Sequence, residues 1–229
     1  MPMPILISVP HAGSRIPSEV EGICLLDSKE IIRDSDEGAD EIYLPLESQV
    51  EAMVTNDVAR AIVDVNRSED DRGRDGVVKT HTCWDVPIYR RPPSETIVRN
   101  LIENYYRPYH EALSSHIKHV RVGLDCHTMA EIGPPVGPDY GKRRPRVCLS
   151  NADGTCPNAW LNALAHCFKA AFDTDASINH PFKGGFIIRS HEKEIPWVQI
   201  ELSRENFISN TEKSRRVFEA LSRWIRTIA

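Results

Sequence analysis

The sequence predicts an α/β fold with a mixed, mostly parallel sheet flanked by helices, formed by residues 1–229 as a single domain. Short apolar runs alternate with helical patterns along the chain, which is typical of parallel or mixed sheets covered on both faces. The 229 residues are enough for one full hydrophobic core. Hydrophobic residues make up 41% and charged residues 27%, a balance that excludes disordered and fibrous chains.

Strands are expected where short runs of β-branched and apolar residues end at polar or turn-forming residues. The segments with this pattern are residues 5–9, 53–55, 61–65, 120–126, 146–150, 185–189 and 198–202. Helices are expected where apolar residues recur at helical spacing. These segments are residues 94–119, 157–172 and 211–228. Ser94 is the expected N-cap of the first helix, and Pro108 should kink or break it.

Two long polar loops are expected between these elements. Residues 68–75 are all charged, Ser or Gly, and residues 132–145 contain four prolines and three glycines. The acidic residues 34–38 form a further loop, which precedes a short helical pattern. Because long loops in compact domains often contribute to a functional site, the loop at 132–145 is expected to lie near one.

Charge and targeting signals narrow the class of protein. Lys and Arg number 28 against 33 Asp and Glu, and the resulting net charge of −5 argues against general nucleic-acid binding. No apolar run approaches the roughly 20 residues of a membrane helix, and the first ten residues lack the basic start of a secretory signal. The six cysteines include no Cys-x-x-Cys pair, which indicates reduced thiols and a cytoplasmic location.

Polar residues follow or end several of the predicted strands. His11, Asn66, Arg67, His127 and Glu201 all occupy such positions. Ligands of open α/β sheets bind at the carboxyl ends of the strands. We therefore expect these side chains to converge on one rim of the sheet.

These residue types can form a hydrolytic metal site. Such a site typically has three protein ligands, an open position for water, and a further carboxylate that moves protons. The residues available for these roles are His11, Asp34, Asp36, Glu37, His127 and Glu201. Each also has a structural alternative, since a histidine after a strand can be an ordinary loop residue and an acidic run can complement a helix dipole. The residues alone leave the acidic ligand open.

Six motifs occur in a characteristic order along most of the chain. They are Ser-Val-Pro-His-Ala-Gly at 8–13, Asp-Ser-Asp at 34–36, Asp-Val-Asn-Arg at 64–67, Asp-Cys-His-Thr at 125–128, Phe-Lys-Gly-Gly-Phe-Ile-Ile-Arg at 182–189 and Gln-Ile-Glu at 199–201. Any one of these motifs is unspecific, but the ordered set resembles the N-formylglutamate amidohydrolase (N-formylglutamate deformylase) family. The set is also similar to a reduced zinc carboxypeptidase or aspartoacylase site.

The resemblance implies a phosphorylase/hydrolase-like, or zinc-exopeptidase-like, fold and hydrolysis of N-formyl-L-glutamate to formate and L-glutamate. It further implies Zn²⁺ or another divalent metal as cofactor, and a small N-acyl amino acid as the partner. The implied site residues are His11, Asp36 and His127 as metal ligands, Asn66 and Arg67 as binders of a substrate carboxylate, and Glu201 as the catalytic base.

The acidic ligand is the position at which the chain departs from related patterns. Zinc carboxypeptidases place it three residues after the first histidine, where this chain has Ser14. The family pattern points instead to residues 34–36, and Asp36 is preferred over Asp34 or Glu37. Glu37 itself stands where many relatives have Trp.

An acylated amino dicarboxylate has two carboxylates, so a second arginine is expected beside Arg67, because guanidinium groups bind carboxylates through two parallel hydrogen bonds. The available residues are Arg90, Arg91, Arg143, Arg144 and Arg189. Arg189 is preferred because it ends a predicted strand close to the glycine pair at 184–185. The other four have the alternative of a solvated basic surface.

Three other functions remain open on sequence grounds. Cys83 with His81 suggests a cysteine nucleophile, although no third orienting group is identifiable. A related zinc-dependent amidase or carboxypeptidase could act on another N-acyl amino acid or on a peptide. A non-catalytic binding protein could keep the fold without the chemistry, but the full set of site residues argues against it.

Overall fold

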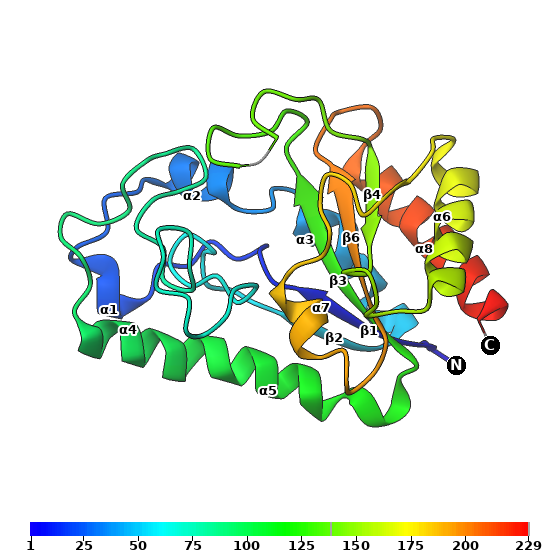
Figure 1. Cartoon of the computed structure of the whole chain (residues 1–229), viewed down its shortest axis with the longest axis horizontal. Coiled ribbons are helices and arrows are strands. Elements are labelled where there is room, and N and C mark those ends of the chain that lie inside the picture. The colour runs from blue at the N-terminus through cyan, green and yellow to red at the C-terminus, as the bar shows by residue number, and fades with distance from the viewer. Residues whose placement is uncertain (138, 229) are drawn as a thin grey trace.

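The structure, a computed structural model, describes residues 1–137 and 139–228, and its centre is a six-stranded sheet between layers of helices (Figure 1). The strands are β1 (Met3–Val9), β2 (Val50–Thr55), β3 (Val122–Met129), β4 (Val147–Ser150), β5 (Ser177–Ile178) and β6 (Trp197–Ser203). Their order in the sheet is β2-β1-β3-β6-β4-β5. Strands β2, β1, β3 and β6 run parallel, and β4 runs antiparallel to β6. The expected mixed, mostly parallel sheet is confirmed.

Helices cover both faces of this sheet. They are α1 (Ser18–Glu21), α2 (Ser28–Asp34), α3 (Ala39–Tyr43), α4 (Glu95–Leu101), α5 (Arg107–Ser115), α6 (Asn158–Phe172), α7 (Phe186–Ser190) and α8 (Asn210–Thr227), with short 3₁₀ or π turns η1 (Leu44–Gln49), η2 (Ile102–Tyr106) and η3 (Ile117–His119). Helices α3, α6 and α8 share one apolar core with the sheet, and α4, α5 and α7 share the other. No helix among the described residues has both the length and the apolar character needed to cross a membrane.

The two faces of the central strands differ in polarity because side chains alternate along a strand. On the face toward α6 and α8, β3 and β6 present apolar residues such as Leu124, Cys126 and Ile200. The opposite face carries buried polar residues, among them Ser8, Asp125, His127, Gln199 and Glu201. The parallel register pairs Asp125 with Gln199 and His127 with Glu201. Strand period and register thus gather the polar side chains into one cluster.

Two of the expected strands are wrong. Residues 61–65 form a turn in which the amides of Ile62 and Val63 donate to the carbonyl of Ala59. Residues 185–189 belong largely to α7. Both segments are short apolar runs buried in the second core, and periodicity alone does not separate such runs from strands. Strand β5 has only two residues and was not expected.

The long helix expected over residues 94–119 is present with an internal change of pitch. The Ser94 hydroxyl accepts a hydrogen bond from the amide of Ile97 and caps α4. Pro108 does not break the helix, because it lies in the first turn of α5, directly after the wider π turn η2. The local change in the hydrogen-bond pattern tolerates the N–H group that proline lacks.

Gly123 is required where β3 passes under Trp197 of β6. A Cβ atom at this position would lie 2.4 Å from the indole ring, and Trp197 is fully buried. We predict that Gly123→Ala lowers the free energy of unfolding by about 1–3 kcal/mol, as overpacked cores do. Gly22→Ala is the matched control, because Gly22 has ordinary helical angles and open space around it. Equal urea midpoints for the two variants would contradict this account.

Candidate metal centre and its cavity

A cavity of about 300 Å³ lies at the carboxyl ends of β1, β3 and β6. The loop after β3 arches over these strand ends and contributes to the wall (Figure 1). Several residues that the sequence singles out line this one cavity, namely His11, Asp36, Asn66, Arg67, His127 and Glu201. Their convergence follows from the parallel arrangement of the strands that carry them.

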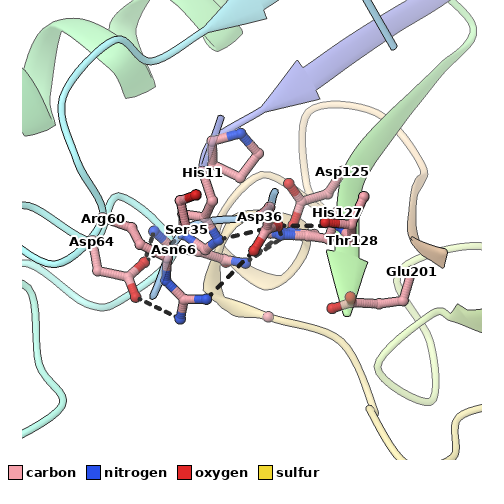
Figure 2. A network of polar contacts seen from close by, with 12 residues as sticks. His11, Ser35, Asp36, Arg60, Asp64, Asn66, Asp125, His127, Thr128 and Glu201 are labelled. Carbon is pink, nitrogen blue, oxygen red and sulfur yellow. Dashed lines mark hydrogen bonds and ion pairs between the residues drawn. The ribbon is translucent and has the colours of Figure 1, made fainter. Parts of the chain in front are cut away.

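His11, Asp36 and His127 form a compact group of buried donors. One ligand atom from each residue lies within 4.8 Å of the other two. Oδ2 of Asp36 is 2.8 Å from Nδ1 of His127 and 3.6 Å from Nδ1 of His11 (Figure 2). The backbone fixes this arrangement, because the amide of Asp36 donates to the carbonyl of His11 at 3.0 Å.

A carboxylate holds the other nitrogen of each histidine. Nε2 of His11 lies 2.7 Å from Asp64, and Nε2 of His127 lies 2.9 Å from Asp125. Asp125 and His127 are two residues apart in β3 and so share a face without any bend in the strand. Each Nε2–H donates to its carboxylate, which leaves Nδ1 directed at Asp36. Metal-binding histidines are typically oriented in this way.

The donor group fits a divalent cation. Nδ1 of His11 is buried and has no hydrogen-bond partner among the described residues, which is unusual for a buried polar atom. Burial alone would lower the pKa of His127, but Asp125 and Asp36 outweigh it and raise the pKa well above its ordinary value. The site therefore favours positive charge. Two imidazoles and one carboxylate are also a common ligand set for zinc.

Asp64 is stabilised as a carboxylate by buried cations. The Nζ atom of Lys79, a fully buried side chain, lies 3.2 Å from Asp64 and 3.0 Å from Asp75. Arg60 contacts Asp64 at 3.4 Å and Asp36 at 3.5 Å. Burial would raise the pKa of Asp64, yet His11 and these cations hold it well below its usual range. The burial of Lys79 was not predicted, because nothing in the surrounding loop sequence distinguishes this lysine from an exposed one.

Glu201 lies beside His127 across the β3–β6 register, and Figure 2 shows it on the opposite side of the cluster from Arg60. It is buried, and Nε2 of Gln199 donates to its Oε1 at 2.9 Å. Burial, together with Asp36 and Asp125, raises the pKa of Glu201 to about 7, against the opposing effect of His127. A carboxyl group with a pKa near neutrality can both accept and return a proton.

Asn66 supports the histidine pair. Its Nδ2 donates to Asp125 at 3.2 Å, and its Oδ1 accepts from the amide of Ile187 at 2.8 Å. A Cβ atom on Gly185 would lie 2.4 Å from this amide, so glycine permits the close approach of α7. The side-chain amide of Asn66 is thus occupied within the protein.

The arginines at the cavity match the expected ones only in part, since Arg67 and Arg144 line it and the preferred Arg189 does not. Arg189 is exposed on α7 and is absent from the described residues that line the cavity, because its segment is helical and turns it outward. Arg90, Arg91 and Arg143 are also absent from this lining. The lining arginines are Arg33, Arg60, Arg67, Arg144 and Arg204. Arg67 and Arg144 were among the residues expected from the sequence, whereas Arg33, Arg60 and Arg204 were not.

Cys83 lines the cavity but lacks the properties of a nucleophile. Burial, reinforced by the nearby carboxylate of Asp34, raises the pKa of the Cys83 thiol to about 11, which disfavours the reactive thiolate. Nδ1 of His81 lies 3.1 Å from the Thr80 hydroxyl. All six cysteines of the chain are free thiols. The geometry therefore favours the metal centre over cysteine chemistry.

Comparisons with known proteins agree on one family. A family model described as N-formylglutamate amidohydrolase matches residues 3–208. N-formylglutamate deformylase from Pseudomonas aeruginosa is 27% identical over 220 residues, covering 88% of this chain and 81% of that protein. The deformylase from Pseudomonas putida is 25% identical and covers 92% and 84%. The crystal structure of N-formylglutamate amidohydrolase from Ralstonia eutropha JMP134 aligns with a TM-score of 0.78 at 18% identity, covering 99% of this chain and 93% of that one.

The contacts of Asp64 and Asp125 with the two histidines can be tested by substitution. We predict that Asp64→Asn and Asp125→Asn each weaken zinc affinity by roughly 10- to 100-fold, because the imidazoles lose their fixed orientation. His127→Ala should abolish stoichiometric zinc binding altogether. Zinc content and competitive chelator titration measure both effects, and Asp57→Asn, which alters an exposed carboxylate paired with Arg15, is the control. Unchanged zinc content in His127→Ala would refute the ligand set.

Proposed function

Because the chain belongs to the N-formylglutamate amidohydrolase family, we propose that it hydrolyses the formyl amide of N-formyl-L-glutamate to formate and L-glutamate with the help of a divalent metal. The observation that carries this proposal is the buried His11–Asp36–His127 group with Glu201 in the same cavity. The names of the two curated relatives, which cover most of the chain, support the substrate.

His11, Asp36 and His127 are the residues that would hold Zn²⁺ or another divalent ion. When bound, the ion supplies a Lewis acid that polarises a carbonyl and lowers the pKa of water. Asp64 and Asp125 keep both Nδ1 atoms facing Asp36. This prior orientation reduces the reorganisation that the site undergoes on loading.

Glu201 is the proposed general base and acid. Its carboxylate takes a proton from the attacking water as the new C–O bond forms at the formyl carbon. It then delivers that proton to the amide nitrogen as the C–N bond breaks, which releases formate and the free amine of glutamate. Its pKa of about 7 suits both directions of transfer near neutral pH. Gln199 holds one carboxylate oxygen in place through the bond to Oε1.

The charge of the cavity supports an anionic substrate. Five arginines line it against four carboxylates, although the chain as a whole has a net charge of −5. Arg67 is the proposed anchor for the substrate carboxylate nearest the reacting amide. Asn66, the other expected binder of this carboxylate, also supports Asp125 and α7 through its side-chain amide. Arg60, beside Asp36, adds positive charge where the formyl oxygen becomes negative.

We further propose that the chain acts as one domain on a small molecule. The free state of all six cysteines is compatible with the reducing cytoplasm, which is the proposed location.

The direct test is hydrolysis of a panel of N-acyl amino acids, measured as release of the free amino acid and, for the formyl members, of formate. We predict release from N-formyl-L-glutamate by zinc-loaded protein, loss of release after chelation, and recovery when zinc is restored. N-acetyl-L-glutamate and N-formyl-L-leucine separate acyl preference from side-chain preference. If no member of the panel is hydrolysed at any metal content, the proposed function is wrong.

Protonation of Glu201 should set the acid limb of the rate profile. Because only the carboxylate accepts a proton, kcat/KM should rise with pH up to about 7 and be lost below it. A bound cation favours the carboxylate and moves this limb to lower pH. We expect Glu201→Gln to lower kcat by about 10²- to 10⁴-fold and to retain zinc. Substantial turnover by Glu201→Gln, or loss of its zinc, would count against this assignment.

A further inference from the structure

Four of the five arginines that line the cavity are already held by acceptors within the protein. Arg67 pairs with Asp75 at 2.8 Å, and Arg144 makes two bonds to Asp139 at 2.6 and 2.8 Å. The other two, Arg60 and Arg204, both contact Asp36. To bind a substrate carboxylate fully, each of these guanidinium groups has to share or give up an existing partner.

Arg33 differs from these four. It lies in the last turn of α2, and its guanidinium group makes no ion pair or hydrogen bond with any described residue. The group stacks on the indole of Trp84, with its central carbon 4.0 Å from the ring centroid. A stacked guanidinium is restrained in its plane, while its N–H groups stay free at the edges to bind a carboxylate.

Two hydrogen bonds fix the position of this stacked pair. Nε1 of Trp84 donates to the carbonyl of Arg33 at 3.0 Å. The amide of Cys83 donates to Asp34, the next residue of α2, at 2.7 Å. The loop that carries Trp84 is thus attached to the end of α2 at two successive positions. The aromatic ring and the arginine are held together before any ligand binds.

The pair lies at the mouth of the site. Arg33 and Trp84 line the metal-centre cavity and also an adjoining hollow of about 520 Å³ that is more open to solvent. They therefore stand between the reacting groups and the exterior. A substrate whose amide sits at the metal centre would direct its far end toward this mouth.

We propose that Arg33, oriented by Trp84, binds the distal carboxylate of an N-acylated amino dicarboxylate and so selects this substrate class. The inference rests on the proposed function, because it assumes that the amide of that substrate reacts at the metal centre. Arg67 serves the carboxylate beside the amide, and Arg33 serves the one at the end of the side chain. Charge-assisted pairing with an already restrained guanidinium costs little further ordering.

This assignment defines what the site rejects. N-formyl-L-glutamine has the shape of N-formyl-L-glutamate but a neutral end, so it leaves Arg33 without its anion. We expect the wild-type protein to favour the glutamate substrate in kcat/KM. In Arg33→Gln that preference should fall by about 10- to 100-fold, chiefly through a higher KM for N-formyl-L-glutamate. Rates with N-formyl-L-glutamine should change little.

Arg226→Gln is the matched control. Arg226 is also an exposed arginine in the last turn of a helix, so its replacement removes the same charge next to a helix carboxyl end. It lies in α8 and is not among the described residues that line the cavity. Its substrate preference should equal that of the wild type. If Arg33→Gln and Arg226→Gln keep the same preference, Arg33 is not the anchor, and the proposed function stands unaffected.

Trp84 is a positioning residue in this proposal, and graded substitution tests it. Trp84→Phe keeps an aromatic face under Arg33 and should retain most of the preference, whereas Trp84→Ala should lose most of it. A merely structural role would lower the rates with both substrates together. Equal losses with N-formyl-L-glutamate and N-formyl-L-glutamine in Trp84→Ala would overturn the positioning role.

Glutarate is a dicarboxylate without an amide. Its binding tests the role of Arg33 independently of the proposed hydrolysis. Calorimetric titration should show affinity about tenfold or more weaker in Arg33→Gln and unchanged in Arg226→Gln. If the wild type hydrolyses nothing yet shows this pattern, the chemistry is wrong and the anchor is supported. If glutarate binds Arg33→Gln as tightly as the wild type, the anchor is wrong whatever the hydrolysis assay shows.

Discussion

Two buried histidine–carboxylate contacts, His11 with Asp64 and His127 with Asp125, determine how the whole site is arranged. Each contact fixes the rotation of an imidazole ring and leaves its Nδ1 facing Asp36. Position in the chain does not by itself give the two histidines this shared orientation. His11 follows β1, whereas His127 lies within β3. The cost of burying carboxylates is offset by cations such as Lys79.

The sheet makes this arrangement possible by separating polar and apolar side chains along the same strands. In β3, Leu124 and Cys126 pack into the core beneath α6 and α8, while Asp125 and His127 lie on the opposite face, where His127 lines the cavity. Parallel pairing with β6 then brings Glu201 next to His127. Because the same backbone atoms form the core and support the site, a shift in register by one residue would exchange the two faces.

The sheet class and the convergence of His11, His127 and Glu201 were predictable, because strand-end residues of parallel strands share an edge. The errors arose where the local pattern was ambiguous. The pattern of residues 185–189 predicts a strand, but the segment folds largely as α7. The helix places Arg189 on the exposed surface, outside the cavity. Lys79 and Arg33 gave no signal, since their roles depend on contacts with Asp64 and Trp84 made only in the folded chain.

The central claim is that the two carboxylates direct a pair of Nδ1 atoms and Asp36 at one cation. Anomalous diffraction at the zinc edge from zinc-loaded crystals tests it most directly. The account predicts one strong peak per chain, bonded to Nδ1 of His11, Nδ1 of His127 and a carboxylate oxygen of Asp36 at roughly 2.0–2.2 Å. Zinc on the Nε2 atoms, or a peak elsewhere in the chain with none at this group, would contradict it.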